Sequence, residues 1–144
     1  MSRATARPLS PHLSIWKWGP HMLVSILNRV TGGALATVGT IVFVWWLAAL
    51  AGGPDSYATF HYWVVKANDA SLFGVLTNLF ARIVAIGLTW SFFQHFANGV
   101  RHFVLDIGAG YELKRNRAGA IGTIVFSVVV TAAMWAYIFS RGIW

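Results

Sequence analysis

A single histidine lies deep within a long apolar stretch of this chain. His95 belongs to the run of residues 72–105 and precedes Arg101 by about six positions, or ~9 Å along a helix. An ionisable side chain at such a depth is costly unless it has a partner, so a functional role is the first hypothesis. His102 follows after nearly two helical turns, with Asn98 between them on the same face.

This arrangement suits a haem held edge-on between helices. His95 would supply an axial nitrogen to the iron, and Gly99 would leave the adjacent surface free of a side chain. Arg101 or His102 would neutralise the propionates. The residues alone leave an alternative open, in which His95 hydrogen-bonds another helix and serves only packing. Because one ligand of this depth is visible, a six-coordinate haem would need a second chain.

A hydroxyl and a guanidinium form a second pair of candidate residues. The dipeptide Gly19-Pro20 is typical of a helix start, and in that helix Ser25 and Arg29 are four residues apart on one face. At the mouth of an apolar bundle, the two side chains would hold the carbonyl oxygens of a quinone. The alternative is an interfacial arginine beside a solvated serine, and spacing alone favours that alternative.

The composition indicates that lipid is the main solvent of the elements carrying these residues. Of 144 residues, 57% are hydrophobic and 10% charged, and a soluble domain would carry roughly 25% charged residues. These values argue against an independent soluble enzyme. The net charge of +7 lies between the apolar runs, so it indicates membrane topology rather than nucleic-acid binding. The absence of cysteine excludes thiolate-ligated iron–sulfur clusters and covalent haem attachment.

Three apolar runs predict an all-α integral membrane protein. Residues 30–54 and 118–140 carry no charged side chain, and each exceeds the ~20 residues that cross a bilayer. Arg82 and Arg101 interrupt the third run but are ~28 Å apart along a helix, which places them at its two interfaces. We expect one domain over residues 1–144, with an N-terminal segment at 1–19 and spans at about 22–51, 72–105 and 118–140.

The distribution of basic residues predicts the orientation. Eight lie in the N-terminal segment and the loop after the second span: Arg3, Arg7, Lys17, Arg29, Arg101, Lys114, Arg115 and Arg117. Three lie on the opposite side: Lys66, Arg82 and Arg141. We therefore expect a cytoplasmic N-terminus and a periplasmic C-terminus in a bacterial inner membrane, with neither a secretory signal nor a convincing mitochondrial transit peptide. Five tryptophans are expected interface anchors: Trp45, Trp46, Trp63, Trp135 and Trp144.

Two motifs of this chain resemble those of the cytochrome b subunits of succinate dehydrogenase, the larger membrane anchor of respiratory complex II. The first is Arg-Pro-Leu-Ser-Pro-His at 7–12, continued by Ser-Ile-Leu-Asn-Arg-Val-Thr-Gly at 25–32. The second is His-Phe-Ala-Asn-Gly-Val-Arg-His at 95–102, closed by Asp106. Their order and spacing around three spans extend the resemblance over nearly the whole chain.

The resemblance implies a role for each matching position. His95 matches the axial ligand of haem b, while the smaller anchor subunit supplies the second ligand and the other half of the helical bundle. Ser25 and Arg29 match residues that line the ubiquinone site, with Ile26 beside them and Trp18 at its border. Arg29 and His102 match positions near the haem propionates.

The resemblance also implies the partners and the reaction. An iron–sulfur subunit and a flavoprotein subunit would carry the clusters and FAD, so electrons from succinate would reach ubiquinone through partner chains. No catalytic activity is expected of this chain alone, and no nucleic acid is expected as a partner. One position departs from the family, because Asn28 occupies the place of a usual histidine and cannot carry a charge near pH 7.

Two other functions remain as alternatives. One is a structural anchor without haem or quinone, in which His95 only packs. The other is the anchor of a fumarate reductase, since the direction of electron flow depends on the quinone and the partners. A transporter or channel is least favoured, because three spans with one buried ionisable candidate make a poor pathway.

Overall fold

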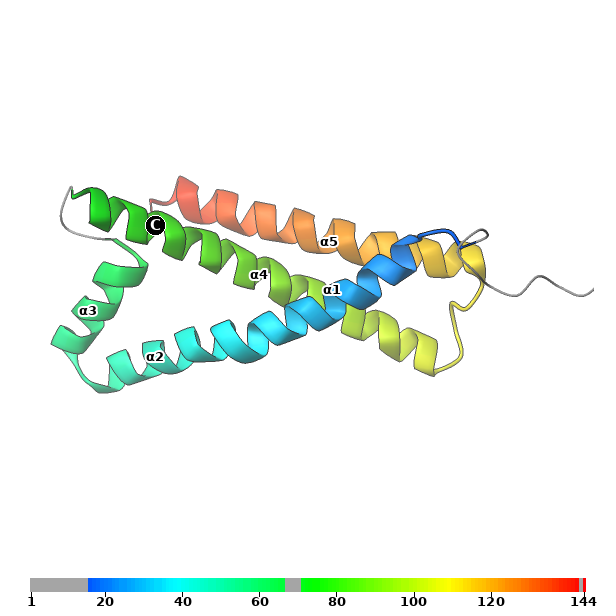
Figure 1. Ribbon diagram of the computed structural model, residues 1–144, viewed down its shortest axis with the longest axis horizontal. Coiled ribbons are helices and arrows are strands. Elements are labelled where there is room, and N and C mark those ends of the chain that lie inside the picture. The colour runs from blue at the N-terminus through cyan, green and yellow to red at the C-terminus, as the bar shows by residue number, and fades with distance from the viewer. Residues whose placement is uncertain (1–15, 67–70, 143) are drawn as a thin grey trace, which may run out of the picture.

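The computed structural model describes residues 16–66, 71–142 and 144, and their regular structure is entirely helical (Figure 1). The elements are α1 (Pro20–Ala34), the π-helical turn η1 (Leu35–Gly39), α2 (Thr40–Ala51), α3 (Pro54–Val64), α4 (Leu72–Asp106) and α5 (Leu113–Ser140). Three helices are long and apolar enough to cross a membrane: Pro20–Ala51, Leu72–Asp106 and Leu113–Ser140. The predicted all-α fold with three membrane-spanning helices is confirmed.

The first span is one continuous helix with a π-helical turn in its middle. Gly19 precedes it in an extended conformation (φ −141°, ψ 160°), and Pro20 occupies the first helical position, where its missing N–H costs nothing. The helix ends where Gly53 adopts φ 86°, a left-handed conformation that favours glycine. The first span therefore begins and ends at residues whose backbone preferences fix those points.

A short helix, α3, connects the first span to the second and was not expected from the sequence. Pro54 begins it directly after Gly53, and Asp55 lies in its first turn, near the positive end of the helix dipole. Figure 1 shows α3 at the end of the molecule opposite the start of α1. The prediction of helices rested on the long apolar runs, and α3 lies between the first and the second of these runs.

The second and third spans form an antiparallel pair joined by the loop 107–112 (Figure 1). The Ser71 hydroxyl caps α4 by accepting a hydrogen bond from the Gly74 N–H at 3.0 Å. Gly108 and Gly110 adopt φ of 83° and 80° in the connection to α5. Helix α5 begins at Leu113, five residues before the uncharged run 118–140. Its first turn therefore carries basic residues that lie outside that run.

Buried polar side chains join α4 to α5. Gln94 is fully buried, and its Oε1 accepts a hydrogen bond from the Ser127 hydroxyl at 2.8 Å. Its amide nitrogen lies 3.5 Å from the Thr123 hydroxyl oxygen. In a bilayer, such hydrogen bonds and close packing hold helices together, because lipid is as apolar as the side chains it contacts. Gln94 therefore fixes the pairing of the two spans one residue away from His95.

Most large apolar side chains point away from the chain's own core. Only Val24, Ala49, Phe60, Ala120 and Trp135 are buried apolar residues among those described. Trp135, an expected interface anchor, is 5% exposed and packs against Trp144 with ring centroids 5.1 Å apart. This monomer thus presents a broad apolar surface, as expected of helices that face lipid and other subunits.

Candidate functional site

His95 lies on α4, which α1 crosses (Figure 1), and its side chain contacts α1. The imidazole is half-buried. Its Nδ1 lies 3.2 Å from the backbone carbonyl oxygen of Asn28 and 3.4 Å from the Thr31 hydroxyl oxygen. Both neighbours come from the middle of α1, so the first span determines how the imidazole is held.

The surroundings of Nδ1 determine which ring nitrogen carries the proton. The carbonyl of Asn28 only accepts hydrogen bonds. The Thr31 hydroxyl donates its one proton to the carbonyl of Leu27 at 2.7 Å, which leaves its lone pairs for Nδ1. Nδ1 therefore carries the hydrogen in the neutral ring, and the lone pair is on Nε2. Within the described residues Nε2 has no hydrogen-bond partner.

Gly32 supplies the space that the imidazole occupies. A Cβ atom at this position would lie 2.9 Å from Cε1 of His95 and 3.3 Å from its Nδ1. The first distance is closer than real Cβ contacts allow, so any side chain here would push the ring aside. At Gly99, one helical turn after His95, an added Cβ would meet nothing within 4 Å. Small residues thus border the imidazole on α1 and leave open space beside it on α4.

These features fit a haem iron as the partner of Nε2. A metal-bound histidine usually donates its other N–H to a carbonyl or carboxylate, which fixes the ring and strengthens it as a ligand. The described residues contain no group of three or more histidine or acidic side chains that would hold a metal ion. A lone imidazole with a free Nε2 suits a metal whose other ligands come from elsewhere, as in a haem.

Ser25 and Arg29 are both exposed on α1. Ser25 precedes Gly32 by seven residues, or almost two turns, and Arg29 by three, so both lie on the flank of α1 that faces His95. Neither side chain has a hydrogen bond or ion pair among the described residues; the ion pair found there joins Arg115 Nε to Glu112 at 3.2 Å. A hydroxyl and an unpaired guanidinium are therefore open to a ligand on this flank.

Ile26 borders that flank, whereas Trp18 lies apart from it. Ile26 is 43% exposed and precedes Arg29 by three residues, which places it about 60° away around α1. Trp18 is 56% exposed and precedes the helix. It lines one hollow of about 300 Å³ that reaches Arg117 and another of about 280 Å³ against α5. Neither hollow includes Ser25, Ile26 or Arg29, so within this chain Trp18 is not gathered with the other quinone-site candidates.

The remaining residues of the second motif face in different directions. His102 is exposed. Arg101 donates a hydrogen bond from Nη2 to Oδ1 of Asn116 on α5. Asn98, which the spacing places on the same face as His95, is fully buried in the bundle, and neither atom of its amide group has a hydrogen-bond partner. The predicted common face of His95, Asn98 and His102 is therefore not uniform: Asn98 is buried between the helices, His95 is half-buried and His102 is exposed.

Thr31 and Gly32 contact His95 but were not among the predicted site residues. Both were visible only as part of the motif at 25–32, and neither residue type by itself indicates a contact with a histidine far along the chain. The Thr31-Gly32 pair could have predicted a close approach of another helix, because small residues in membrane helices commonly lie where two helices pack closely.

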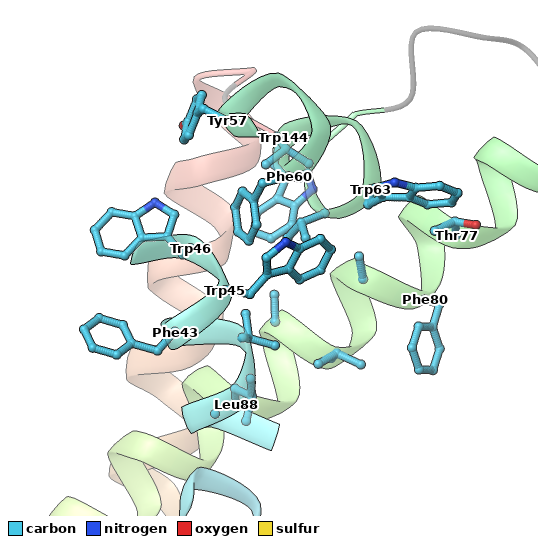
Figure 2. A pocket seen from close by; sticks show the side chains of 17 residues that line it. Phe43, Trp45, Trp46, Tyr57, Phe60, Trp63, Thr77, Phe80, Leu88 and Trp144 are labelled. Carbon is cyan, nitrogen blue, oxygen red and sulfur yellow. The ribbon is translucent and has the colours of Figure 1, made fainter. Parts of the chain in front are cut away.

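A large cavity at the opposite end of the molecule was also missed. It measures about 630 Å³ and lies between α2, α3 and α4. Figure 2 shows aromatic side chains gathered around it, among them Trp45, Phe60, Trp63 and Trp144. No residue predicted to bind haem or quinone lines it. The aromatic clusters at 43–46 and 57–63 were the sequence signal for this feature.

Comparison with known proteins agrees with the two motifs. Residues 3–134 match the family model of the succinate dehydrogenase/fumarate reductase transmembrane subunit. The chain is 31% identical to the succinate dehydrogenase cytochrome b556 subunit of Paracoccus denitrificans, over 91% of this chain and 94% of that protein. It is 33% identical to the subunit of the same name from Rickettsia felis, with 90% of each chain covered. A mitochondrial cytochrome b560 subunit from Mus musculus is 31% identical over 90% of this chain and 70% of its own length.

Proposed function

Because this chain belongs to the succinate dehydrogenase/fumarate reductase transmembrane subunit family, we propose that it binds haem b and helps to form a ubiquinone-reduction site in succinate dehydrogenase. It is a multi-pass membrane protein, with three helices of spanning length. In this role it anchors the complex and contributes no flavin or iron–sulfur chemistry of its own.

The geometry around His95 carries the haem part of the proposal. The Asn28 carbonyl and the Thr31 hydroxyl oxygen both face Nδ1, which leaves the Nε2 lone pair for iron. When bound, haem b supplies a site that gains and loses one electron at a time. His95 would hold its iron from this chain, and a smaller anchor subunit would supply a further protein ligand. Arg29 and His102 would neutralise its propionates.

Ser25 and Arg29 carry the quinone part of the proposal. The serine hydroxyl and the guanidinium would donate hydrogen bonds to a ubiquinone carbonyl oxygen, and the positive charge would stabilise negative charge that develops there during reduction. Ile26 and Trp18 would complete the apolar border of the site. Because Trp18 lies apart from Ser25, Ile26 and Arg29, partner subunits would have to fill the space between them. Reduction consumes two electrons, delivered by the iron–sulfur subunit, and two protons from the adjacent aqueous side.

The departure at Asn28 leaves the contact between residue 28 and His95 intact. The atom of Asn28 that faces His95 is the backbone carbonyl oxygen, which every residue provides. Replacing the family's usual histidine by asparagine therefore removes a titratable side chain without removing an acceptor from Nδ1. Any proton relay that a histidine serves here would fall to other groups.

The partners and the location follow from the same proposal. The iron–sulfur and flavoprotein subunits would cover the end at which α1 begins, where Lys17, Arg101 and the first turn of α5 place basic groups. By the distribution of lysine and arginine, this end is cytoplasmic and the C-terminus periplasmic in a bacterial inner membrane.

The two alternatives differ from this proposal in defined ways. A purely structural anchor would leave His95 without iron, although the open Nε2 favours a ligand. An anchor of fumarate reductase falls within the family description, but the relatives compared are named as succinate dehydrogenase subunits.

Substitution of Arg29 tests the quinone site. In the purified complex, we expect Arg29→Ala to lower succinate–ubiquinone activity at least roughly tenfold, because one charge-assisted hydrogen bond is lost, while succinate–dye activity stays normal. Arg141→Ala is the matched control, since Arg141 is an exposed cation at the C-terminal end of α5, away from the start of α1. Unchanged succinate–ubiquinone activity in Arg29→Ala, with normal dye activity, would remove Arg29 from the site.

A further inference from the structure

We propose that Thr31 is a positioning residue for the haem ligand, and that its hydroxyl oxygen sets the donor strength and the orientation of His95. This inference deepens the proposed function and rests on His95 being the axial ligand. It goes beyond the ligand itself, because it assigns a role in tuning the haem to a side chain on another helix.

The hydrogen bonds of Thr31 are arranged so that its oxygen can act only as an acceptor toward His95. Thr31 is fully buried, and its hydroxyl proton is directed to the Leu27 carbonyl at 2.7 Å. The Asn28 carbonyl lies 3.3 Å from the same hydroxyl. With its one proton donated within α1, the oxygen presents lone pairs to Nδ1 at 3.4 Å.

Two acceptors from successive turns of one helix hold the ring more firmly than one. The Asn28 carbonyl and the Thr31 oxygen share the Nδ1–H, and the absent side chain of Gly32 lets the ring approach α1. Rotation of the imidazole would break these contacts or bring the ring against the α1 backbone. Contacts with α1 therefore help to fix the direction of Nε2 on a histidine that α4 carries.

An acceptor on Nδ1–H also changes the electronic character of the ligand. It shifts electron density toward the imidazole and makes Nε2 a stronger donor, which favours the ferric over the ferrous haem. Removal of the Thr31 oxygen weakens this effect while the backbone carbonyl remains. The midpoint potential of the haem is therefore expected to rise when the hydroxyl is lost, without loss of the iron.

The chain offers a matched control for this substitution. Thr37 lies on the same continuous helix and its hydroxyl also donates to the carbonyl four residues earlier, that of Gly33, at 2.7 Å. Unlike Thr31 it is exposed and has no contact with His95. Thr37→Val therefore removes an equivalent hydrogen bond from a threonine hydroxyl to a helix carbonyl, and it leaves the contacts of His95 unchanged.

The test is a redox titration and a low-temperature electron paramagnetic resonance spectrum of the haem in purified complexes. Thr31→Val is expected to raise the midpoint potential and shift the ferric g values, whereas Thr31→Ser and Thr37→Val keep wild-type values. Thr31→Ala is a second variant without the hydroxyl, for use if the valine form does not assemble. Wild-type potential and g values in the variants that lack the hydroxyl would overturn the inference.

A His95→Ala complex separates this inference from the proposed function. Loss of the haem spectrum in His95→Ala, combined with unchanged potential and g values in Thr31→Val, would reject the role of Thr31 and leave His95 as the ligand. Retention of a normal low-spin spectrum in His95→Ala would reject the ligand, and the inference with it.

Discussion

The two halves of the first span meet the second span in opposite ways. In the first half, α1 approaches α4 closely enough for a backbone carbonyl, a hydroxyl and a bare glycine to contact His95. In the second half, α2 diverges from α4, and a cavity of about 630 Å³ with aromatic walls separates them (Figures 1 and 2). The π-helical turn η1 separates the part of the span that contacts α4 from the part that diverges from it.

The difference shows how one helix serves two purposes. Small and polar residues allow a close approach and let the backbone of α1 take part in the site. Bulky aromatic residues line the space between α2 and α4 and form an apolar surface there. We therefore expect substitutions where α1 contacts His95 to change haem binding. Substitutions around the aromatic cavity between α2 and α4 are expected to leave it unchanged.

The largest effect is expected at Gly32. In Gly32→Ala the new methyl group would lie 2.9 Å from Cε1 of His95 and displace the ring, because the end of a side chain yields more easily than the α1 backbone. The complex should still assemble, but with several-fold less haem per flavin and an altered low-spin spectrum. Haem content would be measured by pyridine haemochrome against the flavin of the complex.

Gly33→Ala is the control for this change. It adds the same methyl group one residue later, where an added Cβ meets nothing within 4 Å of this chain. Its haem content should match wild type. Equal haem content and identical spectra in Gly32→Ala and wild type would show that close approach at Gly32 does not position the ligand.

The smallest effect is expected at Trp45. Its ring packs edge-on against Phe60 at 5.1 Å beside the aromatic cavity, and its loss costs about 0.5–1.5 kcal/mol beyond the buried area. Trp45→Leu should lower the thermal stability of the complex modestly and leave the haem spectrum, content and potential at wild-type values. Haem loss as large as that of Gly32→Ala would mean that the two halves are not independent.

The spans were predictable because the bilayer requires a simple pattern. Inside a bilayer, the backbone polar groups of a long apolar run of this length find their hydrogen-bond partners within a helix, so the fold class followed from residues 30–54, 72–105 and 118–140. Helix α3 was not predictable by this argument, since it is amphipathic, short and aromatic rather than uniformly apolar. The divergence of α2 from α4 depends on side-chain packing, which no local pattern reveals.

The sequence indicates candidate residues for the site but not their contacts. The depth of a lone histidine makes His95 a candidate ligand, and helical spacing predicts that Ser25 and Arg29 share one flank. The acceptors of Nδ1 could not be foreseen, because one is a backbone atom and the other is 64 positions away along the chain. Asn98 shows the limit of spacing arguments, since a rotation of about 60° around α4 takes it from the edge into the interior.

The most direct test of this account is a reduced-minus-oxidised visible spectrum of the complex purified through this chain, compared with that of His95→Ala. The account predicts a low-spin b-type spectrum in the wild type and its loss in the variant, with flavin content unchanged. A b-type spectrum that persists unaltered in His95→Ala, or the absence of any haem signal in the wild-type complex, would contradict it.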